Sequence, residues 1–398
     1  MLKRFCCIFL CFFLFLSTLS VRTFAAEIPD ASSAFSEIDA KSAVLMEAST
    51  GKVLFEKNAD AALPPASVTK IMTMLLVLEA IDAGSISLSD TVRISDYAST
   101  MGGSQVYLKA GEEMTVDDLL KSVIVASAND AAVALAEHVC GSEQAFVARM
   151  NERAAELGMH NTTFKNTNGL DDEDVGHLTS ARDIAIMSRE VLRHKKVFDY
   201  TTIWMDSIRD GAFGLTNTNR LVRFYRGCTG LKTGSTSKAG FCISATAERD
   251  GMHLICVIMG SSTKDARNSL AASLLDWGFS AWSIVTRPAA EGPTLSVHGG
   301  TKDSCQTVCA PITILLSKKD AAKLQTDTVC KEILSAPFAA GDIVGEVTYT
   351  VDGEIVGTAE ITVTEDVPRI GFFELFRRML SAFSLCCSPM TASPNVEG

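Results

Sequence analysis

The sequence predicts an α+β protein: a three-layer domain of sheet and helices, a small all-β domain, and an amphipathic helix at the C-terminus. Three observations lead to this prediction. Strand-like apolar runs occur near residue 45 and again near residue 250, with helical periodicity between them. Alternating apolar and polar residues follow residue 293. The 398 residues also exceed what one hydrophobic core usually organises.

The first 26 residues are predicted to be a signal peptide. Lys3 and Arg4 precede an apolar run over residues 5–16, and Phe24-Ala25-Ala26 supplies small residues for cleavage. Because the run is too short for a comfortable bilayer span, a cleaved signal is favoured, and an uncleaved N-terminal anchor stays open as the alternative. The chain is therefore expected to be exported.

The first domain is expected over residues 27–289. A β-hairpin is predicted around Ser49-Thr50-Gly51. The run that follows Ser67 is apolar nearly all round, so its helix belongs in the interior. The other expected elements are helices over 115–141, 142–157 and 266–277, and strands over 43–46, 52–55, 241–247 and 253–259.

The second domain is expected over residues 290–367. Residues 346–351 and 359–364 alternate between apolar and polar types, and Asp352-Gly353 between them suits a tight hairpin turn. Residues 368–398 are assigned to a separate helix and tail.

Charge and residue spacing argue against two classes of function. The net charge of −11 becomes about −14 once the three basic residues of the signal are removed, so the phosphates of a nucleic acid would be repelled. The twelve cysteines and six histidines are dispersed without zinc-site or H-E-x-x-H spacing. No metal ion and no cofactor are expected, and Cys242 and Cys256 are predicted to be small core residues.

A Ser-x-x-Lys tetrad at Ser67 and Lys70 is the first candidate for chemistry. On a helix, a lysine three residues after a serine lies on the same face and can take its proton. The chain contains four such tetrads, starting at Ser49, Ser67, Ser235 and Ser261, but only the one at Ser67 sits where a helix begins. There the positive end of the helix dipole and burial both favour a neutral Lys70, which can act as a base.

Two further motifs carry little information when taken singly. Ser127-Ala128-Asn129 consists of three common residue types. Lys232-Thr233-Gly234 occurs once, and in isolation a solvated lysine before a glycine turn is the favoured interpretation.

Together and in this order, the three motifs resemble those of penicillin-binding proteins and active-site serine β-lactamases. Ala128 stands where the pattern S-D-N has aspartate, which favours the carboxypeptidases. The flanking residues resemble those of the low-molecular-mass serine-type D-alanyl-D-alanine carboxypeptidases over residues 43–279. The matching segments are residues 65–70, 127–131, 150–151, 157–159, 168–170, 230–234 and 239–240.

The resemblance implies a penicillin-recognising, serine β-lactamase-like domain that removes the last D-alanine of a peptidoglycan pentapeptide and is inhibited by β-lactams. It implies that Ser67 is the nucleophile, Lys70 the base and Ser127 a proton relay. The same resemblance implies that the substrate is held by Asn129, Lys232, Thr233, Ser235 and Arg267, with the backbone N–H groups of Ser67 and Ser235 forming an oxyanion hole. For Arg267, an ordinary position on a helix surface remains an equal alternative.

Two other functions stay open. A serine β-lactamase would share the fold, but residues 162–168 offer no carboxylate for rapid deacylation, and the nearest acids, within residues 171–174, look like an exposed loop. A non-catalytic wall-binding protein on the same fold is disfavoured because Ser67, Lys70 and Lys232 are all present.

The C-terminal segment, residues 369–385, is expected to attach the protein to the outer face of the cytoplasmic membrane. On a helix, Phe372, Phe373, Phe376, Met379, Leu380 and Phe383 share one face, opposite Glu374, Arg377, Arg378, Ser381 and Ser384. Such a helix suits the plane of the membrane interface and cannot span the bilayer. The alternative is a helix that docks on the β domain as core.

Overall fold

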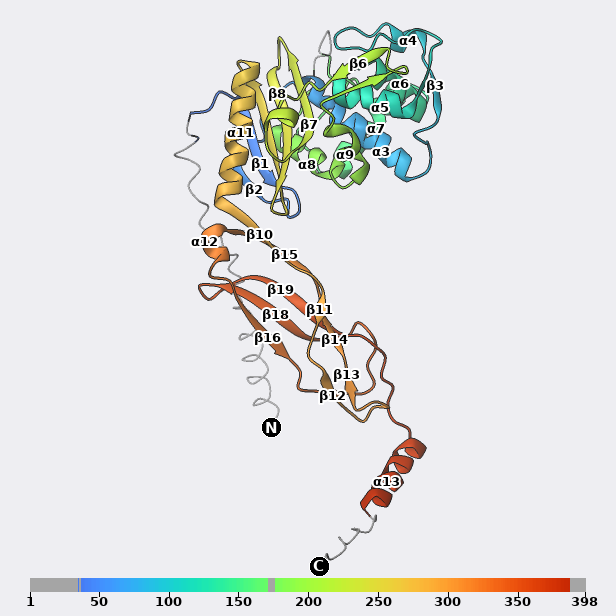
Figure 1. Ribbon diagram of the computed structural model, residues 1–398, viewed down its shortest axis with the longest axis vertical. Helices are drawn as coiled ribbons and strands as arrows, with labels where there is room; N and C mark the ends of the chain where they lie inside the picture. Colours follow the sequence, from blue (N-terminus) through green and yellow to red (C-terminus); the bar gives the residue numbers. More distant parts are fainter. Residues whose placement is uncertain (1–34, 36, 171–175, 387–398) are drawn as a thin grey trace, which may run out of the picture. The chain divides into compact units, whose positions relative to one another are not determined.

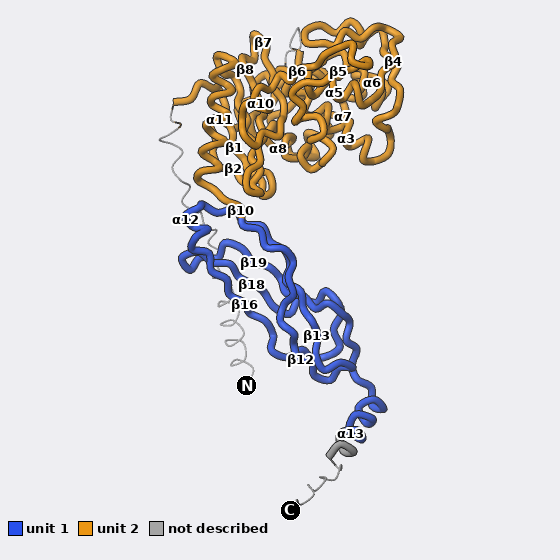
Figure 2. The backbone as a smooth tube through the Cα atoms, in the orientation of Figure 1, with its two compact units in different colours: residues 1–27, 285–398 blue, residues 28–284 orange. Residues whose placement is uncertain are grey.

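The computed structural model describes residue 35, residues 37–170 and residues 176–386, with side chains up to residue 381. The predicted signal peptide, the acidic residues 171–174 and Cys387 lie outside the described residues. Two compact units are present: Ile28–Ile284 form one, and the chain from Val285 onward belongs to the other (Figure 2). Strand β10 (Trp282–Arg287) carries the chain from the first unit to the second.

A five-stranded antiparallel sheet in the order β2-β1-β9-β8-β7 forms the centre of the first unit. Its strands are β1 (Ser42–Glu47), β2 (Val53–Lys57), β7 (Cys228–Thr236), β8 (Gly240–Arg249) and β9 (Met252–Ser261). Every residue of β1 is buried, so both faces of the sheet are covered. The N-terminal hairpin and the later strands therefore meet in one sheet, as the sequence predicts.

Helices cover the two faces of this sheet. Helix α11 (Lys264–Ala281) lies on one face, and α8 (Ala181–Val191) lies on the other, followed by α3 (Lys70–Asp82) (Figure 1). The residues of α3 from Lys70 to Leu78 are all buried, which confirms the interior helix. The result is the predicted three-layer α+β architecture.

The helical stretch predicted over residues 115–141 is broken at the second motif. Helix α5 (Val116–Lys121) passes into a π-helical turn (Ser122–Ala126), and α6 (Asn129–Cys140) starts anew. Between them, Ser127 has a left-handed backbone with φ of +63°. Apolar periodicity continues through this break, which is why the sequence alone does not reveal it.

The rest of this unit consists of one long helix and short connecting elements. Helix α7 (Glu143–Glu156) follows Gly141, whose φ is +80°. The short elements are β3 (Thr91–Arg93), α4 (Asp96–Ser99), β4 (Glu113–Thr115), a 3₁₀ turn (Lys195–Val197), α9 (Phe198–Thr201), β5 (Met205–Ile208), β6 (Phe213–Thr216) and α10 (Leu221–Phe224).

The second unit is built from β-sheets. A five-stranded sheet has the order β11-β14-β19-β18-β16, and a three-stranded sheet has the order β13-β12-β17. The turn between β18 (Ile343–Val351) and β19 (Glu354–Val363) has positive φ at both Asp352 and Gly353, as the predicted hairpin requires. The other elements are β11 (Ala290–Glu291), β12 (Leu295–His298), β13 (Ser304–Cys305), β14 (Thr307–Cys309), β15 (Ile312–Ser317), α12 (Lys318–Ala321), β16 (Gln325–Cys330) and β17 (Ile333–Ser335).

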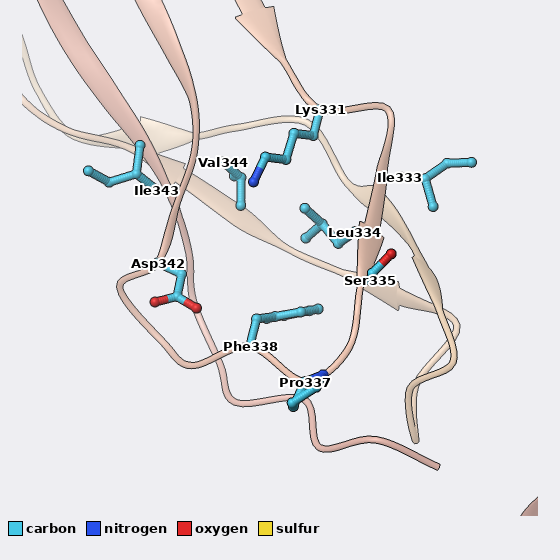
Figure 3. Close-up of a pocket in the computed structure, with 9 residues that line it drawn as sticks. All are labelled: Lys331, Ile333, Leu334, Ser335, Pro337, Phe338, Asp342, Ile343 and Val344. Atoms are coloured by element: carbon cyan, nitrogen blue, oxygen red, sulfur yellow. The ribbon is translucent and has the colours of Figure 1, made fainter. Parts of the chain in front are cut away.

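A hollow of about 540 Å³ opens in this β unit, and none of the predicted site residues is among those that line it (Figure 3). It is lined by apolar and polar residues: Lys331, Ile333, Leu334, Ser335, Pro337, Phe338, Asp342, Ile343 and Val344. Helix α13 (Phe372–Cys386) ends the described chain (Figure 1). None of the described helices is both long and apolar enough to cross a membrane.

Candidate active site

Ser67 lies on a 3₁₀ turn (Ala66–Thr69) that runs directly into α3. Two glycines let other segments approach this turn. A Cβ added to Gly234 would lie 2.7 Å from the backbone nitrogen of Ser67, and a Cβ added to Gly169 would lie 1.8 Å from the carbonyl oxygen of Ala66. Only glycine therefore allows strand β7 and the loop at Gly169 to pack against the nucleophile's turn.

Lys70 is fully buried, and its ammonium group has three hydrogen-bond acceptors. Its Nζ lies 3.0 Å from Ser67 Oγ, 2.6 Å from Asn129 Oδ1 and 2.7 Å from the carbonyl oxygen of Asn168. Burial, helped by the charge of Lys232 and opposed by that of Asp130, holds the pKa of Lys70 well below its usual value. A neutral Lys70 can donate to Asn129 and Asn168 and accept the proton of Ser67.

Ser127 faces Lys232 across the site. Lys232 is buried in β7, where its Nζ donates to Ser127 Oγ at 2.8 Å and to the carbonyl oxygen of Thr233 at 3.0 Å. The interpretation of Lys232 as a solvated lysine before a turn is wrong, because Lys232 lies within strand β7, which pairs with β8, and is only 1% exposed. Burial, followed by the charge of Arg267, lowers the pKa of Lys232 to about 7.

Asn129 makes hydrogen bonds to other parts of the chain through its side chain and its backbone. Its Oδ1 accepts from Lys70, its Nδ2 donates to the carbonyl oxygen of Gly102 at 2.7 Å, and its backbone N–H donates to Ser104. The expected contact of Asn129 with the substrate's amide stays a prediction. Its neighbour Asp130 is buried and accepts hydrogen bonds from the backbone of Val106 and Leu108, which fixes the loop that carries Gly102.

The remaining predicted residues lie along β7 and on α11. Thr233 Oγ1 donates to Thr218 Oγ1 at 2.8 Å, and Ser235 is exposed on the same strand. Arg267 is only 2% exposed, so the alternative of a surface arginine is wrong. Its hydrogen bonds go to neutral oxygens of Cys242 and Asn268, and burial lowers its pKa to about 10.

Several residues of the site were not identified from the sequence. The segments containing Asn168, Gly169 and Asp130 were among those that matched the family, but nothing in their residue types indicated a role. Thr218 and Gly102 gave no signal at all, because each acts through contacts with residues far away in the sequence. Among the described residues, no group of three or more histidine, cysteine, aspartate or glutamate side chains could hold a metal ion.

Comparison with known protein families shows to which family the chain belongs. Residues 27–263 match the sequence model of the family described as D-alanyl-D-alanine carboxypeptidase. The chain belongs to this family. Residues 290–369 of this carboxypeptidase also match the family described as penicillin-binding protein 5, C-terminal domain.

Individual relatives agree with this assignment over most of the chain. The carboxypeptidase is 42% identical to D-alanyl-D-alanine carboxypeptidase DacF of Bacillus subtilis, over 86% of this chain and 89% of the relative. Its fold is similar to that of penicillin-binding protein 5 from Haemophilus influenzae, with a TM-score of 0.72 and 32% identity over 84% of this chain and 98% of that chain. Penicillin-binding protein D2 of Listeria monocytogenes, solved in its ampicillin-bound form, matches with a TM-score of 0.56 and 32% identity over 61% of this chain and 98% of that one. The protein is a serine-type carboxypeptidase with a penicillin-recognising fold.

Proposed function

We propose that this carboxypeptidase removes the terminal D-alanine from the stem peptides of peptidoglycan through an acyl-enzyme at Ser67. The observation that carries this proposal is the contact between Ser67 Oγ and the buried Lys70 Nζ at 3.0 Å. A serine hydroxyl becomes a useful nucleophile when an adjacent base takes its proton, and burial keeps the amine of Lys70 available for that task.

In the acylation step, Ser67 Oγ attacks the carbonyl carbon between the two D-alanines while its proton passes to Lys70. The backbone N–H groups of Ser67 and Ser235 stabilise the oxyanion. Ser127, which is hydrogen-bonded to Lys232, gives a proton to the departing amine. Water then hydrolyses the ester: its hydroxyl joins the acyl carbon and its proton restores Ser127, while Lys70 returns its proton to Ser67 and the shortened peptide is released.

Recognition of a free carboxylate is assigned to Lys232, Thr233 and Arg267. Both Lys232 and Arg267 are buried cations, and the hydrogen bonds of both go to neutral oxygen atoms. Burial removes the water that would stabilise these positive charges, and an anion bound beside them would stabilise them instead. A substrate that ends in a free acid supplies this anion.

The test is the mass of the intact protein after exposure to penicillin and, separately, to a peptide that ends in D-Ala-D-Ala. We expect one penicilloyl group on the wild-type protein, none on Ser67→Ala, and release of D-alanine only by the wild type. An adduct on Ser67→Ala would refute the nucleophile. Rapid turnover of penicillin would favour a β-lactamase, and the absence of any acylation would favour a wall-binding protein.

Binding of β-lactams by this chain is part of the same proposal. The Listeria relative in its ampicillin-bound form supports it, since that structure shares the fold at 32% identity. A lactam places a strained amide next to a carboxylate, so the residues that hold the peptide would also hold the inhibitor.

We also propose that α13 attaches the enzyme to the outer face of the cytoplasmic membrane. Phe372 and Phe373 are 76% and 86% exposed, and Phe376, Met379 and Leu380 are also exposed. These exposures argue against docking of the helix as ordinary core. Arg377 pairs with Glu374 on the same helix, and Arg378 pairs with Asp303 of the β unit. Exposed aromatic residues beside arginines favour the interface of an anionic bilayer.

Deleting residues 368–398 should give an enzyme that no longer sediments with anionic phospholipid vesicles but still cleaves a soluble peptide. The double variant Phe373→Ser, Phe376→Ser should behave in the same way. Phe224→Ser, which changes a phenylalanine that is 68% exposed in the other unit, is the matched control and should keep vesicle binding. Vesicle binding by the truncated enzyme would refute the anchor, and loss of peptide cleavage would make the helix part of the fold.

A further inference from the structure

Thr218 lies beside the candidate site without belonging to any of its three motifs. It follows β6 (Phe213–Thr216), and its Oγ1 accepts a hydrogen bond from Thr233 Oγ1 at 2.8 Å. Its backbone N–H donates to the carbonyl oxygen of Val125 at 3.1 Å, in the π-helical turn that leads to Ser127. Thr218 therefore contacts both the strand that carries Thr233 and the segment that carries Ser127.

Two buried asparagines hold Thr218 in place. Asn217 Nδ2 donates to the carbonyl oxygen of Ile203 at 2.7 Å, and Asn219 Nδ2 donates to the carbonyl oxygen of Gly230 in β7 at 2.9 Å. Asn217 Oδ1 also accepts the backbone N–H of Asn219 at 2.9 Å. Thr218 itself is half-buried, so it lies at the edge of the site and not in the core. The hydrogen bonds of the two asparagines hold the segment that carries it.

We propose that Thr218 is a positioning residue for recognition of the substrate's carboxylate, acting through the hydroxyl of Thr233. This inference rests on the proposed function, in which Thr233 binds that carboxylate. A threonine hydroxyl can donate only one hydrogen bond, and without substrate Thr233 donates it to Thr218. When a carboxylate binds, Thr233 must turn its proton toward the anion.

Thr218 makes this change favourable because it can reverse its role. Once Thr233 donates to the carboxylate, the oxygen of Thr233 is free to accept, and a small reorientation of the Thr218 side chain lets its hydroxyl donate to it. The two hydroxyls then form a chain in which each bond polarises the next, directed toward the anion. A substrate with an amide in place of the carboxylate presents a weaker acceptor and gains less from this chain.

The test compares two peptides that differ only in a free or an amidated terminal D-alanine. Thr218→Val keeps the shape of the side chain and removes the hydroxyl. We expect it to lower kcat/KM on the acid peptide about 3- to 10-fold, the usual scale for one hydrogen bond, and to leave the amide peptide within about twofold. Thr218→Ser should retain the wild-type preference for the acid.

The matched control is Thr229→Val on β7, the strand that carries Thr233. Thr229 Oγ1 donates to Thr246 Oγ1 at 2.8 Å and also lies 2.8 Å from His253 Nε2, so this variant breaks a threonine pair of the same length, and one contact more, outside the motifs. It should not change the ratio of kcat/KM for the two peptides. If Thr218→Val proves unstable, the acid-to-amide ratio of Thr218→Ala and of Thr218→Ser decides the matter.

Several results would overturn the inference: an equal loss on both peptides, a Thr218→Ser variant as impaired as Thr218→Val, or no loss at all. A wild-type enzyme that does not distinguish acid from amide would instead refute carboxylate recognition itself, and the role of Thr218 would fall with it. Labelling of the wild type at Ser67 by penicillin is recorded in parallel. It separates failure of this inference from failure of the proposed nucleophile.

Discussion

Replacing Gly169 with alanine should damage the active site far more than it damages the fold. The added Cβ would lie 1.8 Å from the carbonyl oxygen of Ala66 and 2.7 Å from Thr69 Oγ1. The loop and the turn that carries Ser67 would have to separate by about 1.5 Å to reach van der Waals contact. Because Asn168 moves with this loop, its 2.7 Å contact with Lys70 would be broken.

A displacement of this size predicts a loss of about 100-fold in the rate of acylation, since a shift of about 1 Å can cost that much in an oriented reaction. The assay is the second-order rate of labelling by a fluorescent penicillin, confirmed by intact-protein mass. Thermal unfolding is measured in parallel to show that the variant is folded.

Gly141→Ala is the matched control. Gly141 has a φ of +80°, against +81° for Gly169, but nothing lies within 4 Å of its added Cβ. This variant should carry only the backbone strain of about 1 kcal/mol, which lowers the Tm by about 2–4 °C, and should acylate at the wild-type rate. If folded Gly169→Ala acylated within about threefold of the wild type, the loop would not position Lys70 and Ser67 as described.

Three further predictions concern the buried basic residues Lys70, Lys232 and Arg267. Lys70→Arg should slow acylation by about 10²- to 10⁴-fold, measured by intact mass against time, because a guanidinium stays charged and cannot take the proton of Ser67; a near-normal rate would assign the base elsewhere. The pKa of Lys232 is about 7 in the folded protein and 10.5 in the unfolded chain. Between pH 7 and pH 10.5 the unfolded chain therefore keeps a proton on Lys232 that the folded protein has lost. The free energy of unfolding of the wild type accordingly increases as the pH rises through this range. The Tm of Lys232→Met, relative to wild type, should therefore be higher at pH 7 than at pH 10, and an equal difference at both pH values would refute the shift. Arg267→Met should lower kcat/KM about tenfold on an acid peptide and little on its amide, whereas an equal loss on both would indicate a structural role.

The local elements were predictable because each depends on neighbouring residues. The Asp352-Gly353 turn suits positive φ at both positions, and the apolar run after Ser67 requires burial. These two predictions are confirmed because hairpin turns and helix periodicity are properties of short segments. The choice of the Ser67 tetrad by its position at a helix start is less secure, because the tetrad at Ser261 also ends on the first residue of a helix, Lys264 of α11. The 3.0 Å contact between Lys70 Nζ and Ser67 Oγ is what supports the tetrad at Ser67.

The break at Ser127 and the strand at Lys232 were not predictable in this way. Residues 115–141 have continuous helical periodicity, and the chain leaves the helix at Ser127 only in the folded protein. Lys232 lies in the segment Gly230-Leu231-Lys232-Thr233-Gly234, which lacks the apolar alternation of a strand, and this segment is a strand because it pairs with β8. Segments remote in the sequence, Thr218 and Ser104, contact the backbone on either side of the break at Ser127, whereas β7 becomes a strand by pairing with β8, the next strand along the chain.

The sequence by itself determined which residues could perform chemistry: a serine and a lysine at helical spacing, two further motifs, and an acidic chain with no metal-binding pattern. Only the tertiary structure decided their chemical state. Lys70 meets Asn129 and Asn168 across 59 and 98 residues of sequence, and Lys232 meets Ser127 across 105 residues. Burial by these distant segments removes water from both ammonium groups and lowers their pKa values. Local sequence fixes what a side chain can do, whereas desolvation depends on everything that surrounds it and exists only once the chain has folded.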